Sequence, residues 1–191
     1  MRAQNGSVGL FVLLLIPILA VGIVRVVWNI QFDINCGKRL ERAATANSIS
    51  IANEEMEAAL RYIEAHKLTS GYTSILWKSP EEDVEFWYRN LVASQEELES
   101  LLAKSEGVSA MESSNVLLKL RESLMGKDRH IAPPGISAFP SNTAMAFAFF
   151  ITGLAFVVGL WHLLPEHSTI EILIVIAIIG ILVATTSSGV I

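Results

Sequence analysis

The chain has 191 residues, of which 52% are hydrophobic, and a formal net charge of −5 at pH 7. Residues 33–140 carry seventeen acidic and twelve basic side chains, whereas three long apolar runs outside them hold almost no charge. This acidic surplus argues against a nucleic-acid partner, because phosphate binding requires a basic patch. The single cysteine, Cys36, excludes an intramolecular disulfide and a cysteine-based metal cluster.

The first apolar run covers residues 8–28 and ends at an aromatic residue, Trp28. About 20 apolar residues cross about 30 Å of hydrocarbon as a helix, and tryptophan is common at the membrane interface. The run therefore predicts a transmembrane helix. A cleaved secretory signal is the alternative. Arg2 precedes the run, and the small residues Ala20 and Gly22 within it have the spacing of a cleavage site. The length of the run favours a retained anchor.

Residues 33–126 have the pattern of a soluble helical bundle. Residues 29–37 are expected to be a non-helical stretch. Residues 38–67 then predict one helix with a coiled-coil-like seam, because their apolar side chains recur at alternating steps of three and four. The seam residues are Ile49, Ala52, Met56, Ala59 and Ile63.

Two further helices of the bundle are marked by their start signals. Ser79-Pro80-Glu81-Glu82 has capping-box spacing with a proline at the first helical position, and Ser109 with Glu112 repeats that spacing. Apolar stripes follow each signal, at Val84, Trp87, Leu91, Leu98 and Leu101 and then at Leu117, Leu120 and Leu124. Short turns between three amphipathic helices predict an antiparallel bundle.

The remainder of the chain returns to apolar sequence. Residues 127–142 are rich in proline and predict an extended linker, with packing of its apolar residues on the bundle as the alternative. Residues 143–164 and 169–186 predict a second and a third transmembrane helix. Gly180, Ala184 and Ser188 lie four apart and would permit close helix packing, although such patterns also arise from lipid-compatible composition alone.

Together these elements predict an all-α membrane protein, in which one N-terminal and two C-terminal transmembrane helices bracket a three-helix soluble bundle. Basic residues next to membrane spans prefer the cytoplasmic side. Lys38, Arg39 and Arg42 follow the first span, and Lys127 and Arg129 precede the second. We therefore expect an integral protein of a bacterial inner membrane with its bundle in the cytoplasm.

Residue patterns that carry catalysis are missing from the sequence. The four histidines have no paired helical spacing for a metal, and no phosphate-cradling glycine loop or nucleophile elbow occurs. The carboxylates fall on predicted solvent faces. Ionisable residues inside a membrane mark ion paths, and their absence from the span centres argues against a pump or transporter. We expect no enzyme activity, no cofactor and no metal.

An aromatic connector at residues 72–88 is the best candidate for a specific surface. Its candidate partner or ligand residues are Tyr72, Trp77, Trp87 and Tyr88. Aromatic rings of this kind anchor partners or line small-ligand pockets. The alternative is that they close one end of the bundle core, because aromatic residues at helical spacing usually pack inside.

The pattern favours a non-enzymatic, membrane-anchored scaffold or accessory subunit of a membrane complex. Its partners would be the lipid bilayer and either other membrane proteins or further copies of the chain. The alternative is a membrane sensor that binds a small ligand near the aromatic connector and signals through a separate protein.

Overall fold

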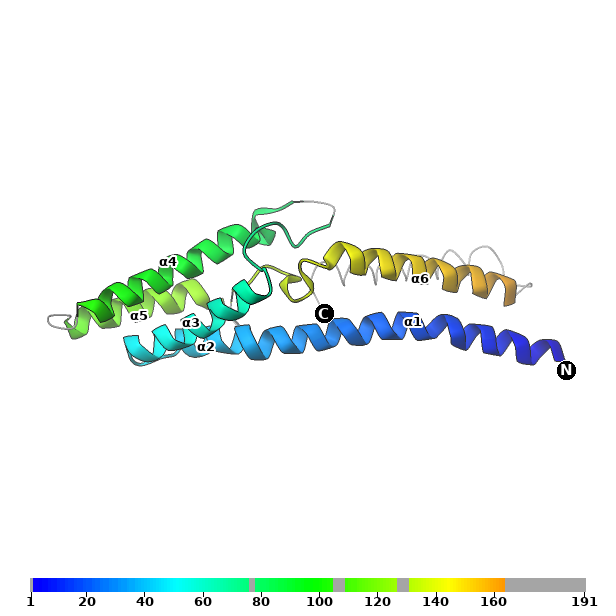
Figure 1. Ribbon diagram of the computed structural model, residues 1–191, viewed down its shortest axis with the longest axis horizontal. Coiled ribbons are helices and arrows are strands. Elements are labelled where there is room, and N and C mark those ends of the chain that lie inside the picture. Colours follow the sequence, from blue (N-terminus) through cyan, green and yellow to red (C-terminus); the bar gives the residue numbers. More distant parts are fainter. Residues whose placement is uncertain (1, 76–77, 105–108, 127–130, 164–191) are drawn as a thin grey trace.

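The computed structural model describes residues 2–75, 78–104, 109–126 and 131–163 (Figure 1). Helices dominate these residues and no strand occurs among them, which confirms the predicted all-α class. The molecule is elongated. At one end α1 (Arg2–Phe32) lies antiparallel to α6 (Asn142–Leu163), and a helical bundle built from residues 38–124 forms the other end (Figure 1).

The first helix continues into the bundle without a break. A π-helical turn, η1 (Asp33–Gly37), joins α1 directly to α2 (Lys38–Ala44). The sequence prediction of a non-helical stretch at 29–37 is therefore wrong. Phe32, Cys36 and Leu40 lie four residues apart and are all buried, so one apolar stripe runs through the turn and favours a continuous helix.

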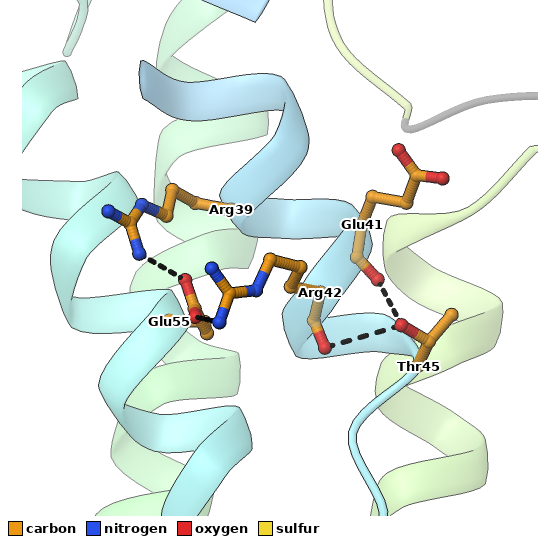
Figure 2. Close-up of polar contacts among 5 residues, drawn as sticks. All are labelled: Arg39, Glu41, Arg42, Thr45 and Glu55. Carbon is orange, nitrogen blue, oxygen red and sulfur yellow. Dashed lines mark hydrogen bonds and ion pairs between the residues drawn. The ribbon is translucent and has the colours of Figure 1, made fainter. Parts of the chain in front are cut away.

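The prediction of one helix over residues 38–67 is also wrong, because these residues form two helices. α2 ends at Ala44, and α3 (Ile49–Ala65) folds back along it. The hydroxyl of Thr45 donates to the carbonyl of Glu41 at 2.9 Å, which closes the end of α2 (Figure 2). Ser48 then caps α3, because its hydroxyl accepts from the amide of Ile51 at 3.4 Å.

The predicted seam of α3 is confirmed over most of its length. Four of its five residues are buried in the core, and the fifth, Ile49, packs against it at the edge. A buried aliphatic side chain contributes about 1.5–3 kcal/mol relative to an exposed one, so this stripe is a major source of the helix's stability.

The last two bundle helices are α4 (Val84–Ala103) and α5 (Ala110–Leu124). The capping sequence forms a short 3₁₀ turn, η2 (Pro80–Glu82), in which the Glu82 carboxylate accepts from the Ser79 amide at 3.3 Å. Asp83 then caps α4, which begins later than the spacing predicts. The predicted α4 stripe is buried throughout. In the described part of the chain four helices pack together where the pattern predicts three.

The residues before α6 form a folded junction, so the predicted extended linker is wrong for 131–141. A 3₁₀ turn, η3 (Ile136–Ala138), packs against α1 and buries Ile136. At the start of α6 the Asn142 amide donates to the carbonyl of Thr73 at 2.5 Å. Apolar side chains in this segment gain more by burial than by an exposed path, which accounts for the difference.

Within the described residues, one helical stretch is long and apolar enough to cross a membrane. It runs from Ile16 to Ala44 with a mean hydropathy of 1.4, while the apolar part of α6, Asn142–Val157, is shorter. Exposed apolar side chains on these two helices include Ile16, Leu19, Ile23, Val26, Ile30, Phe147, Phe150, Ile151 and Leu154. The predicted third span, 169–186, lies outside the described residues.

Candidate functional site

A cavity of about 460 Å³ opens between the first half of α4, the end of α5 and the segment 131–134. This volume lies within the range of small-molecule sites, about 300–1,000 Å³. We call it the Trp87 cavity, and its lining residues are Pro80, Glu81, Asp83, Phe86, Trp87, Asn90, Leu91, Ser94, Ser123, Leu124, Ile131, Ala132, Pro133 and Pro134.

Trp87 connects two walls of this cavity, α4 and the segment 131–134. Its ring is buried in the core, and its indole Nε1 donates to the carbonyl oxygen of Ile131 at 2.8 Å. That bond holds the segment 131–134 against α4 and satisfies the only polar atom of the indole. Leu91 and Leu124 are also buried, whereas Phe86 is exposed. The walls are therefore largely apolar and partly aromatic.

The polar groups of the Trp87 cavity are two carboxylates, the neutral side-chain amide of Asn90 and two hydroxyls that are already engaged. Oδ1 of Asp83 accepts from the amide of Phe86 at 3.0 Å, which caps α4 and places a carboxylate at one edge. Glu81 adds a second carboxylate in η2. The hydroxyls of Ser94 and Ser123 donate to backbone carbonyls of their own helices at 2.9 Å and 2.8 Å. Among the described residues, no lysine or arginine lines the cavity.

The structure separates the four aromatic residues that the sequence singles out. Of the three that the structure describes, only Trp87 lines the cavity. Tyr72 is exposed, and Nζ of Lys78 lies 5.1 Å from its ring centroid, a cation–π contact. Trp77 lies outside the described residues. Phe86, the neighbour of Trp87 on the same connector, also lines the cavity, although it is not among the four candidate residues.

Tyr88 joins two helices of the bundle away from the cavity. Its hydroxyl donates to the carboxylate of Glu64 at 2.8 Å, which links α4 to α3. The hydrogen bond to Glu64 raises the pKa of Tyr88, because ionisation would remove the donated proton and set two negative charges side by side.

Glu55 is a buried carboxylate held by two arginines. Its side chain is 5% exposed, and its oxygens lie 2.8 Å from Nη1 of Arg39 and 2.6 Å from Nη2 of Arg42 (Figure 2). The expectation that all carboxylates face solvent is therefore wrong at this position. The sequence does hold a signal, because Glu55 lies three residues after Ala52 and four before Ala59, on the buried face of α3.

The described residues contain no group of three histidine, cysteine or acidic side chains that could hold a metal ion. Cys36 is a free thiol buried where η1 meets the core. The predicted helix-packing residues Gly180, Ala184 and Ser188 lie outside the part of the chain that the structure describes. Comparison with protein-family models, with curated proteins and with solved structures finds no match for this chain.

Proposed function

We propose that the protein is a membrane-anchored helical scaffold or accessory subunit that acts through contacts with other proteins and carries no catalytic activity. The observation that supports this most directly is the apolar surface of α1 and α6. Ile23 and Phe147, for example, are 63% and 62% exposed. Soluble monomers rarely expose contiguous apolar patches larger than a few hundred Å². Lipid, or helices of partner membrane proteins, would cover such a surface.

The connection between α1 and the bundle suits an anchoring role. α1, η1 and α2 form one uninterrupted rod, and two arginines of α2 hold Glu55 of α3. A helix that passes from an anchor into a bundle fixes the orientation of that bundle more firmly than a flexible linker does. A scaffold benefits from such rigidity, because its docking surfaces are then held at a set angle to the membrane.

The remaining parts of the proposal concern placement and partners. The arrangement that we propose has three transmembrane spans, at 8–28, 143–164 and 169–186, in a bacterial inner membrane with the bundle in the cytoplasm. The basic residues beside the first two spans support this orientation. The partners would be the bilayer and other membrane proteins, or further copies of this chain.

A pair of matched substitutions tests the anchor. Leu19→Lys places a charge on the exposed face of α1, near the centre of the proposed span 8–28, and Ile51→Lys places one at an exposed position of the bundle helix α3. A lysine at the centre of a membrane span costs about 2.5–3.5 kcal/mol on insertion scales, so only the first variant should lose membrane retention. Extraction of the native protein by alkaline carbonate would overturn the anchor.

Purification of the native protein in mild detergent tests the scaffold. Stoichiometric membrane proteins, or a defined homo-oligomer, should co-purify with the wild-type chain. Cross-linking in intact membranes before extraction provides an independent readout that detergent does not disturb. A monomer without cross-linked neighbours in both experiments would overturn the scaffold while leaving the anchor intact.

The Trp87 cavity favours a second candidate function, a ligand sensor. Its residue Asp83 directly precedes α4, where the amide of Val84 donates to the carbonyl of Gly71 at 3.0 Å. Thr73, two residues further on, accepts from Asn142 at the start of α6. A ligand in the cavity would therefore sit beside the contacts that join the bundle to α6.

Distance measurements by electron paramagnetic resonance test the sensor. Spin labels at Glu96→Cys on α4 and Thr143→Cys on α6, in a Cys36→Ala background, report the position of the bundle relative to α6. Both labelled positions are exposed, so the labels should not disturb the core. A distance distribution that shifts when a ligand fills the cavity supports the sensor, and one that stays unchanged at saturation contradicts it.

A further inference from the structure

The charged groups that the Trp87 cavity offers to a ligand are carboxylates, which accept hydrogen bonds, and the neutral side-chain amide of Asn90 lies beside them in the lining. The indole N–H and the hydroxyls of Ser94 and Ser123 already donate to backbone carbonyls. Pro133 and Pro134 have no amide hydrogen to give. Glu81 and Asp83 contribute carboxylates, and the lining residues that the structure describes include no basic side chain. A ligand that matches this edge carries donors and a positive charge.

The walls of the same cavity are apolar and favour a ligand whose main part is also apolar. Phe86, Trp87, Leu91 and Leu124 line it together with three prolines. Burial of apolar ligand surface against these side chains supplies most of the binding free energy. The faces of aromatic rings also attract cations within about 6 Å, which adds to the attraction of the two carboxylates.

We infer that the Trp87 cavity binds small organic ammonium compounds, with the apolar body against Trp87 and the ammonium group toward Glu81 and Asp83. This inference rests on the second proposed function, the ligand sensor, and specifies the chemical class of its ligand. An anion is disfavoured because it would meet two carboxylates, and the described part of the lining offers no cation to compensate them. A neutral ligand of the same shape would gain the apolar contacts but would lack the electrostatic contribution.

Three compounds of similar size and different charge test the class. They are 2-phenylethylammonium, 2-phenylethanol and phenylacetate, titrated against the full-length protein in nanodiscs of zwitterionic lipid. Saturation-transfer NMR gives the dissociation constants, and empty nanodiscs correct for partition into lipid. We expect the ammonium compound to bind at least about fivefold more tightly than the alcohol, and phenylacetate to bind more weakly than both.

Variants with matched loss of charge locate the site. Glu81→Gln with Asp83→Asn removes both carboxylates, and asparagine still caps α4. This pair should abolish the preference for the ammonium compound and leave the affinity for 2-phenylethanol unchanged. Glu85→Gln with Glu96→Gln removes the same charge from exposed positions of α4 outside the lining and should retain the preference.

Each outcome bears on one part of the inference. Equal affinity for all three compounds, or a preference that survives in the Glu81→Gln, Asp83→Asn variant, would overturn the ligand class. Absence of saturation transfer from any of the compounds would overturn the cavity as a binding site. If 2-phenylethylammonium binds as expected but leaves the distance between α4 and α6 unchanged, the cavity assignment stands and the sensor function fails.

Discussion

The contact of Glu55 with Arg39 and Arg42 is asymmetric, and the asymmetry predicts which partner matters more. The Glu55 side chain is 5% exposed, whereas the arginine side chains are 43% and 65% exposed. Without Glu55, both guanidinium groups can rotate into water. Without the arginines, the carboxylate stays buried and uncompensated. We therefore expect Arg39→Met with Arg42→Met to destabilise the bundle more than Glu55→Gln does.

The magnitudes follow from this difference in burial. Stranding a buried charge costs about 3–5 kcal/mol, and we expect a loss near the lower limit for the double arginine variant, because local rearrangement would admit some water. Methionine preserves the apolar stem of each arginine, so the loss reports the charge. Glu55→Gln retains the shape and one acceptor, and we expect a loss of about 1–2 kcal/mol.

Urea unfolding of the full-length protein in mild detergent, followed by far-ultraviolet circular dichroism, measures these free energies. Glu57→Gln is the matched control, because Glu57 lies two residues away on α3 and pairs with Arg61 at the surface. We expect this variant to change the free energy of unfolding by less than about 0.5 kcal/mol. The reasoning is refuted if Glu55→Gln costs as much as the double arginine variant, or if Glu57→Gln costs as much as Glu55→Gln.

Three further predictions concern other parts of the fold. Gly71 has φ +109°, and an added Cβ would lie 3.0 Å from Cζ of Phe139. Gly71→Ala should therefore lower the free energy of unfolding in urea by about 1–3 kcal/mol. Gly22→Ala is the control and should not destabilise the protein, because its Cβ meets nothing within 4 Å. The thiol of Cys36 is buried, so maleimide should label it only after unfolding, and labelling as fast as that of Glu96→Cys in a Cys36→Ala background would contradict this burial. The raised pKa of Tyr88 means that its hydrogen bond to Glu64 stabilises the bundle below the ordinary tyrosine pKa of about 10 and loses this contribution as pH rises through the folded-state value. Wild type should therefore lose more stability than Tyr88→Phe between pH 8 and pH 11, and equal losses would exclude the role of this contact.

Hydrophobic periodicity in the sequence predicts most of the helices and their buried faces. The stripe of α4 is buried at every predicted position, and α6 begins one residue before the predicted start at Thr143. Ser109 caps α5 as its spacing predicts, with its hydroxyl accepting from the amide of Glu112 at 3.1 Å. These features depend on residues within a few positions of one another, so they can be predicted from local sequence patterns.

The errors occur where two local signals compete. Around residues 29–37 the polar side chains suggest a loop, yet Phe32, Cys36 and Leu40 maintain one buried stripe and the chain remains helical. Residues 38–67 are expected to form one helix, yet Ser48 has an extended backbone and begins a new one. Both of the prevailing signals are present in the sequence, but tertiary packing decides which signal prevails, and a local pattern does not rank them.

The candidate site depends on contacts that are distant in sequence, and this explains why only part of it could be predicted. The bond between Trp87 and Ile131 spans 44 residues, and it creates the cavity by holding the segment 131–134 beside α4. An aromatic residue at helical spacing is compatible with a core position and with a binding surface. Trp87 occupies both, since its ring is buried in the bundle and also lines the cavity.

The two proposed functions require different behaviour of the two connections between the bundle and the apolar helices α1 and α6. A scaffold requires that the bundle stay fixed relative to α1, and the α1–η1–α2 rod with the Glu55 ion pairs meets that demand on one side of the molecule. A sensor requires that another part move, and α6, which packs along α1, is joined to the bundle at its first residue by the hydrogen bond of Asn142 with Thr73. Weakening the Glu55 pairs should therefore impair a scaffold, whereas Asn142→Ala should alter the response of α6 to a ligand. Comparison of these two variants separates the functions, because each perturbs one connection and leaves the other in place.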